Sequence, residues 1–169
     1  MNVSKSLRNL VTAALFAAAI TVVTAYFLHI PIPGTSGYVH LGDALIYLAA
    51  CLLPMPYAVG AASIGASLAD LLTAPAWVAP TFFIKAMIVL QFSSESEKLL
   101  SRRNIVAACA ATILSPTLYT CALFLMAGGE AGLVPQFIGT LIQGVGSLVV
   151  FFPIAIALDR MDFKAKLHR

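Results

Sequence analysis

The amino-acid sequence predicts an all-α integral membrane protein, a bundle of six transmembrane helices that forms a single domain over residues 1–169. Of the 169 residues, 60% are hydrophobic and only 10% are charged, whereas about 25% of the residues of a typical soluble domain are charged. The mean hydropathy is +0.95, and apolar residues occur along the whole chain. Because apolar segments of ~20 residues span a hydrocarbon core of ~30 Å as helices, a lipid bilayer is the expected solvent.

Apolar runs separated by proline, glycine and charged residues predict where the six helices lie. The first run is expected to be a true span and not a secretory signal peptide, because no soluble domain follows residues 1–28. The second and fourth runs are short for full spans, so we expect their helices to pack strongly against neighbours or to extend into flanking loops. The predicted helices cover about residues 7–28, 41–53, 57–73, 80–92, 104–127 and 136–158.

Basic residues predict the orientation of this bundle. An even number of helices places both termini on one side of the membrane, and the positive-inside rule assigns the basic side to the cytoplasm. Nine of the ten basic residues lie in the terminal segments or in the loop after the fourth helix: Lys5, Arg8, Lys98, Arg102, Arg103, Arg160, Lys164, Lys166 and Arg169. The outer segments 29–40, 74–79 and 128–135 contain none. The N- and C-termini are therefore predicted to be cytoplasmic.

Small residues recur at four-residue spacing on the first and third predicted helices. Such spacing lets two helices approach closely in lipid, where packing drives association. One interpretation is packing within the chain, and the other is a docking face for a second membrane subunit, for which the first helix is the better candidate. The residues are Ala13, Ala14, Ala17 and Ala18 on the first helix and Ala61, Gly65 and Ala69 on the third.

Three ionisable residues fall inside predicted spans, where a charge is costly unless it is paired or hydrated. With a rise of ~1.5 Å per residue, Asp43, Asp70 and Lys85 all lie within the outer ~10 Å of the membrane. One interpretation is a structural ion pair between Asp70 and Lys85 that holds helices in register. The other is that Lys85 or Asp43 faces a pocket open to the outside and binds a polar ligand, and the two interpretations are compatible.

Aromatic and polar side chains gather at the same depth and predict a binding pocket. A flat, polar ring compound requires an aromatic surface and a few amide or hydroxyl groups. Trp77 also fits an interfacial aromatic belt, which binds no ligand. Together with Asp43 and Lys85, the candidate substrate-binding residues are Tyr38, His40, Trp77, Thr81, Tyr119, Gln136, Thr140 and Gln143.

The outer segment 29–40 is predicted to form a lid over this pocket. It contains Pro31, Pro33, Gly34 and Gly37, whose restricted or permissive backbones prevent a continuous helix. A loop over a pocket that is held by helices is a typical gating element.

No motif indicates an enzyme. The sequence lacks G-x-x-x-x-G-K-[ST], H-E-x-x-H, G-x-S-x-G and a paired acidic cluster. His29 and His40 have no metal-ligand spacing, and the cysteines have none either, so we expect no metal, cofactor or nucleic-acid partner. Concentrative uptake would then need an ion gradient or a partner ATPase. The alternative function is a stand-alone secondary transporter with Asp43, Asp70 and Lys85 as an ion or proton relay.

Three segments resemble a known family. They are Gly37-Tyr38-Val39-His40-Leu41-Gly42-Asp43-Ala44, then Gly65-Ala66-Ser67-Leu68-Ala69-Asp70-Leu71-Leu72, and Pro80-Thr81 followed by Ile84-Lys85-Ala86. Together they resemble the substrate-binding S components of energy-coupling factor (ECF) vitamin transporters, over nearly the whole chain.

The resemblance implies a six-helix protein that binds a small water-soluble compound at the outer face of a bacterial cytoplasmic membrane. It implies a transmembrane T subunit and two ATPase subunits as partners, which supply the energy for import. It also implies that Ala13, Ala14, Ala17 and Ala18 contact the T subunit and that the first outer loop acts as a lid. Similar family members are associated with riboflavin, with hydroxymethylpyrimidine or pyridoxine-like compounds, or with queuosine precursors, and a neutral heteroaromatic compound is the expected class.

Overall fold

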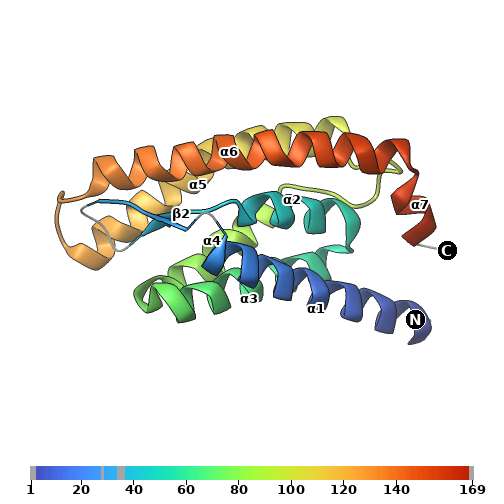
Figure 1. The fold of residues 1–169 in the computed structure, drawn as a ribbon, viewed down its shortest axis with the longest axis horizontal. Coiled ribbons are helices and arrows are strands. Elements are labelled where there is room, and N and C mark those ends of the chain that lie inside the picture. Colours follow the sequence, from blue (N-terminus) through green and yellow to red (C-terminus); the bar gives the residue numbers. More distant parts are fainter. Residues whose placement is uncertain (1–2, 28, 34–36, 168–169) are drawn as a thin grey trace.

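The computed structural model describes residues 3–27, 29–33 and 37–167, which form a helical bundle with a short β-hairpin at one end (Figure 1). The long helices are α1 (Val3–Tyr26), α3 (Met55–Thr73), α5 (Arg102–Ala127) and α6 (Leu133–Arg160). The shorter elements are β1 (Ile30–Pro31), β2 (Tyr38–Val39), α2 (Gly42–Leu52), the 3-10 helix η1 (Pro75–Trp77), α4 (Val78–Val89) and α7 (Phe163–Leu167).

The predicted fold class is confirmed. In the described part of the chain, four helices are long and apolar enough to cross a membrane, and the shorter apolar helices Gly42–Leu52 and Pro75–Val89 complete the six. The observed helix ends differ from the predicted ones by a few residues. For example, α1 begins at Val3 and not at residue 7, so the polar residues before the apolar run are also helical. Residue 28, the predicted end of this helix, lies outside the described residues.

Local sequence explains where α5 begins and ends. The Ser101 side chain accepts a hydrogen bond from the backbone N–H of Asn104 and so caps the first turn. At the other end, Gly128 adopts a left-handed conformation with φ 64°, and Gly132 does the same with φ 82° just before α6. These two glycines produce the tight reversal between α5 and α6.

Helices α1 and α3 cross in close contact. A Cβ atom at Gly65 would lie 2.7 Å from the carbonyl oxygen of Ala17, so only glycine allows this approach. The Thr21 hydroxyl donates a hydrogen bond across the crossing to the carbonyl oxygen of Gly65, at 2.9 Å. The small residues at this crossing therefore serve packing within the chain.

The short helix α2 lies inside the bundle, between α6 and α1 in the view of Figure 1. Almost every α2 residue is buried. Its Tyr47 ring stacks on Phe92 at 5.3 Å between ring centroids and meets Phe151 edge-on at 5.7 Å. A helix of 11 residues is too short to span a bilayer on its own. Because the neighbouring helices surround α2, its ends are covered by protein and it does not have to cross the whole bilayer.

Both termini lie at one end of the bundle, and the β-hairpin lies toward the other (Figure 1). At the terminal end, the segment after α4 is tied to the end of α6 and to α7. The Asp159 carboxylate accepts hydrogen bonds from the backbone N–H groups of Leu99 and Leu100, at 2.7 and 3.0 Å. The Lys164 ammonium donates to the carbonyl oxygen of Ser96 at 2.6 Å.

The predicted lid segment contains the antiparallel hairpin of β1 and β2. Ile30 pairs with Val39, and Pro31 pairs with Tyr38. Gly34, one of the residues expected to break a helix here, lies outside the described residues. A Cβ atom at Gly139 of α6 would lie 2.6 Å from the Ile32 side chain, so this glycine makes room for the hairpin to pack against α6.

Candidate functional site

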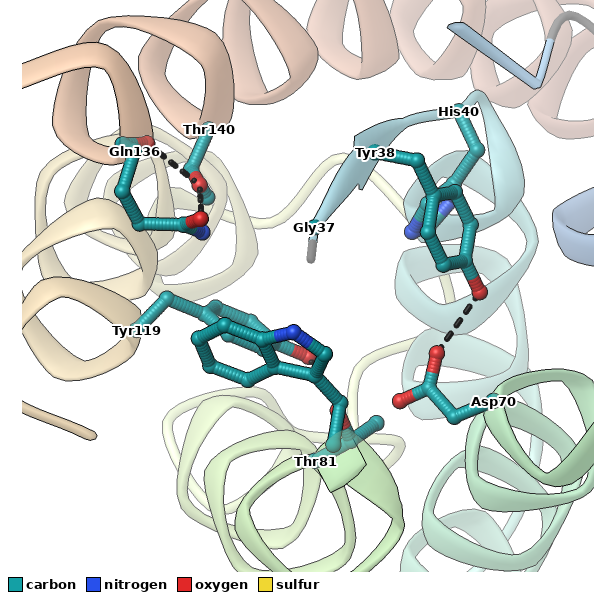
Figure 2. A pocket seen from close by; sticks show the side chains of 9 residues that line it. Gly37, Tyr38, His40, Asp70, Thr81, Tyr119, Gln136 and Thr140 are labelled. Carbon is teal, nitrogen blue, oxygen red and sulfur yellow. Dashed lines mark hydrogen bonds between the residues drawn. The ribbon is translucent and has the colours of Figure 1, made fainter. Parts of the chain in front are cut away.

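A cavity beneath the hairpin is lined by residues from six parts of the chain: the hairpin segment, α3, η1, α4, α5 and α6 (Figure 2). The cavity is small, about 30 Å³, compared with ~300–1,000 Å³ for typical ligand sites. It is lined by Gly37, Tyr38, His40, Asp70, Trp77, Thr81, Tyr119, Gln136 and Thr140.

The hairpin is tied to α3 across this cavity. The Tyr38 hydroxyl donates a hydrogen bond to the Asp70 carboxylate at 2.6 Å, as drawn in Figure 2. The His29 ring, just before β1, stacks on the Tyr38 ring of β2, with 3.8 Å between the two ring centroids. Burial, together with the adjacent Asp70 charge, raises the pKa of Tyr38 well above its usual range, so the hydroxyl keeps its proton and remains a donor.

His40 is neutral and has a defined tautomer. Its Nδ1 accepts a hydrogen bond from the backbone N–H of Gly42 at 3.0 Å, which places the ring proton on Nε2. Burial lowers the pKa of His40 to about 4, against the opposing effect of the nearby Asp43 charge. Gly42 is required here because a Cβ atom would overlap the Thr24 hydroxyl.

An aromatic wall forms the side of the cavity near α4 and α5. The Trp77 and Tyr119 rings lie 5.5 Å apart at an interplanar angle of 54°, and the hydroxyls of Tyr119 and Thr81 are hydrogen-bonded at 2.9 Å. Trp77 is only 2% exposed. It therefore lies in the cavity wall and not in an interfacial belt, and its contact with a ligand stays a prediction.

Helix α6 contributes an amide and a hydroxyl to another wall of the cavity. The Gln136 Nε2 donates to the Thr140 hydroxyl at 3.1 Å, and this hydroxyl donates to the backbone carbonyl of Gln136 at 2.9 Å. Gln136 is 3% exposed, and its Oε1 atom is buried without a hydrogen-bond partner. The wall therefore offers an acceptor.

A buried charged cluster lies next to the cavity. The Lys85 ammonium donates to the Asp43 carboxylate at 2.6 Å, the other Asp43 oxygen accepts from Gln143 at 2.8 Å, and Lys85 and Asp43 side chains are 1% and 2% exposed. The Lys85 ammonium also lies 5.1 Å from the centre of the Tyr119 ring. Asp43, Lys85 and Gln143 are the candidate binding residues that do not line the cavity.

The predicted ion pair between Asp70 and Lys85 is wrong. Lys85 pairs with Asp43, whereas the Asp70 carboxylate accepts from Tyr38. The physical reason is that α2 lies inside the bundle, where Asp43 in its first turn meets α4 and α6. The three charges lie near one another in the fold, but depth along each helix did not determine which faces meet.

Sequence reasoning missed the contributions of three residues to the site. Gly37 lines the cavity, and Asp70 lines it as the acceptor for Tyr38. His29, the first residue of the predicted lid segment, stacks on the Tyr38 ring. The pattern of aromatic residues around the outer loop was the available signal for His29, whereas no local signal indicated the role of Asp70.

The four predicted docking alanines fall into two groups. Ala13 is buried and Ala17 is half-buried against α3, whereas Ala14 and Ala18 are exposed. All four line an open apolar groove of about 430 Å³ between α1 and α3, together with Gly60 and its neighbours on α3. Packing within the chain therefore accounts for Ala13 and Ala17, whereas docking through Ala14 and Ala18 stays a prediction.

Comparison with known proteins assigns the family. Residues 4–160 match the model of the ECF-type riboflavin transporter, S component. An uncharacterized protein in a gap 3' region of Pyrococcus woesei is 29% identical over 131 residues, which cover 76% of this chain and 86% of that relative. No solved structure gives a significant match. Because the family match covers most of the chain, this multi-pass membrane protein belongs to the S components of ECF transporters, in the riboflavin-type family.

Proposed function

We propose that this S component captures a small, neutral, water-soluble heteroaromatic compound at the outer face of a bacterial cytoplasmic membrane. Riboflavin, a hydroxymethylpyrimidine or pyridoxine-like compound, or a queuosine precursor belongs to this class. The observation that carries the proposal is the cavity under the hairpin, which combines the aromatic wall of Trp77 and Tyr119 with the amide of Gln136. This combination suits a flat ring with polar edges.

The electrostatics of the site favour a neutral ligand. Among the described residues, the Lys85 ammonium lies 5.1 Å from the centre of the Tyr119 ring in the cavity wall, and the Asp43 carboxylate neutralises it through a 2.6 Å contact. His40 is uncharged at neutral pH, since burial lowers its pKa to about 4. A strongly anionic ligand would therefore meet no free positive charge among the residues that line the cavity.

Ligand entry requires the hairpin to move. The cavity of about 30 Å³ accommodates water but no ring compound. The contacts that hold the hairpin down include the hydrogen bond from Tyr38 to Asp70 and the packing of Ile32 against Gly139. Both contacts must break for the cavity to open, so the hairpin is placed to act as the lid.

Import depends on an ECF module, which we propose to consist of a transmembrane T subunit and two ATPases. The exposed Ala14 and Ala18 lie in the apolar groove of about 430 Å³, where a partner helix would approach closely. Membership of the S-component family disfavours the alternative of a stand-alone transporter. Lys85 is held by Asp43, and Asp70 is held separately by Tyr38, so the three ionisable residues are already engaged in two separate contacts.

Native mass spectrometry of the detergent-purified chain tests the capture function. After expression in rich medium, we expect a heteroaromatic compound bound at one molecule per chain and released on denaturation. Trp77→Ala, which removes part of the aromatic wall, should lose the compound, whereas the matched aromatic control Phe83→Ala, on an exposed side chain, should retain it. An empty chain that also fails to bind vitamins and deazapurines in thermal-shift assays would contradict the proposal.

A further inference from the structure

The hydrogen bonds in the cavity wall indicate which donor groups the ligand carries, whereas the shape and composition of the cavity do not. Gln136 is the informative residue, because its Oε1 is buried and has no hydrogen-bond partner in the described structure. A buried carbonyl oxygen without a partner loses its hydration without compensation. In a cavity wall, such an atom indicates a position where a ligand completes the hydrogen bonding.

The orientation of the Gln136 amide follows from Thr140. The Thr140 hydroxyl has a single hydrogen, and it donates this hydrogen to the backbone carbonyl of Gln136 at 2.9 Å. Toward the Gln136 side chain the hydroxyl can then only accept, so it binds the Nε2 group, at 3.1 Å. The reversed amide would make one hydrogen bond in place of two, because both oxygens would compete for the same hydrogen. Thr140 therefore directs Oε1 away from itself.

Figure 2 shows the Gln136 amide reaching from α6 toward the cavity, with Tyr38 and Asp70 on the far side. On that side Asp70 is also an acceptor, since its carboxylate receives the Tyr38 hydroxyl hydrogen. Acceptor atoms therefore stand on opposite sides of the cavity, and Figure 2 shows Tyr119 between them. The Trp77 ring lies 5.5 Å from the Tyr119 ring and extends this aromatic wall. A ring compound that stacks on this wall places one of its edges near Gln136.

We propose that Gln136 selects ligands whose ring edge carries an N–H or amino hydrogen, and that Thr140 is the positioning residue that keeps its Oε1 in the accepting orientation. This inference rests on the proposed capture of a heteroaromatic compound and narrows it to donor-bearing nitrogen heterocycles, such as lactams, imides and amino-substituted rings. An analogue with a methyl group in place of that hydrogen leaves the buried oxygen unpaired and adds volume. The Gln136 side chain is thus expected to account for the weaker binding of the methylated analogue.

Paired probes test the proposal by calorimetry on the detergent-purified chain. They are riboflavin with 3-methylriboflavin, 7-cyano-7-deazaguanine with its N1-methyl derivative, and 4-amino-5-hydroxymethyl-2-methylpyrimidine with its dimethylamino derivative. For the parent compound that binds the wild-type protein, we expect the methylated partner to bind at least about 100-fold more weakly. Gln136→Met, which keeps the length of the side chain but removes the acceptor, should reduce this ratio by about 10–100-fold.

Two further variants separate specificity from general damage. Thr140→Val should reduce the same ratio, because the amide is then free to reverse, while the parent compound still binds. Thr117→Val is the matched control, since the Thr117 hydroxyl makes the same bond to the preceding turn, to the carbonyl oxygen of Ile113, on an exposed position of α5. Gln91→Met is the corresponding control for Gln136 and changes a side chain at the end of α4. Both controls should keep the wild-type ratio.

The outcomes distinguish this inference from the proposed function. An unchanged ratio in Gln136→Met, with the parent compound still bound, would overturn the role of Gln136 and leave capture of a heteroaromatic compound intact. If Gln136→Met binds neither probe, an unchanged ratio in Thr140→Val overturns the proposal and a reduced ratio supports it. Failure of the wild-type chain to bind any parent compound would overturn the proposed function together with this inference.

Discussion

Removal of the Lys85 charge is the perturbation whose effect can be worked out most directly from the structure. In Lys85→Met the side chain keeps an apolar stem that is one atom shorter, but the Asp43 carboxylate loses the ammonium 2.6 Å away and keeps only the Gln143 amide at 2.8 Å. Asp43 is 1% exposed, so water cannot replace the lost partner. Breaking a buried ion pair on one side costs about 3–5 kcal/mol of unfolding free energy.

A second substitution separates the lost pair from a change in packing. Asp43→Asn in the Lys85→Met background removes the unpaired charge but keeps an oxygen for the Gln143 amide. We expect the double variant to recover more than half of the lost unfolding free energy, because no charge then remains buried without a partner. Lys98→Met, outside the helices, is the control and should change stability by about 0.5 kcal/mol or less.

Reversible unfolding in bicelles, followed by steric trapping, measures these free energies. The reasoning is refuted if Lys85→Met loses less than about 1 kcal/mol, or if the double variant is no more stable than the single one. Because Lys85 does not line the cavity, the folded fraction of Lys85→Met should retain its ligand affinity. A loss of affinity with unchanged stability would instead indicate that Lys85 contacts the ligand directly.

Three further predictions concern the groove, the pH response and the lid. Ala14→Trp should abolish cellular uptake but leave ligand binding by the purified chain intact, because the indole fills the apolar groove. The control Leu15→Trp, at another exposed position of α1, should change neither uptake nor binding. Equal loss of uptake and binding in Ala14→Trp would indicate a role in folding. The contribution of neutral His40 to the free energy of unfolding should be complete above pH 6.5 and should be lost as the pH falls toward its native pKa of about 4. The loss of unfolding free energy is about 2 kcal/mol at pH 5. Thermal denaturation of wild-type and His40→Asn chains between pH 7 and 4.5 measures it, and an equal pH dependence of the two melting temperatures would contradict the prediction. Gly139→Val should push Ile32 and the hairpin away from α6 and accelerate ligand dissociation about 10-fold in stopped-flow measurements, whereas Gly60→Val, where a Cβ meets nothing within 4 Å, should leave the rate unchanged.

Much of the candidate site was predictable because depth in a membrane follows from position along a helix. The residues from Tyr38 to Thr140 that were expected to surround a ligand mostly do surround one cavity. The errors concern partners. Lys85 lies 15 residues from Asp70 and 42 residues from Asp43 in the sequence, yet it pairs with Asp43. Depth along a helix axis is a local quantity, but the direction of a side chain around that axis depends on how the helices pack.

The sequence by itself determined that the chain is a membrane protein. It also determined the positions of the apolar helices along the chain and which loops are basic. These properties depend on local composition and on the thickness of a bilayer, and both can be evaluated segment by segment. Tertiary structure alone decided that Ala17 meets Gly65 while Ala14 remains exposed, and that the Gln136 oxygen is left without a partner in the cavity wall. The physical reason is that helix rotation and crossing are set by contacts between segments distant in sequence, which no local pattern encodes.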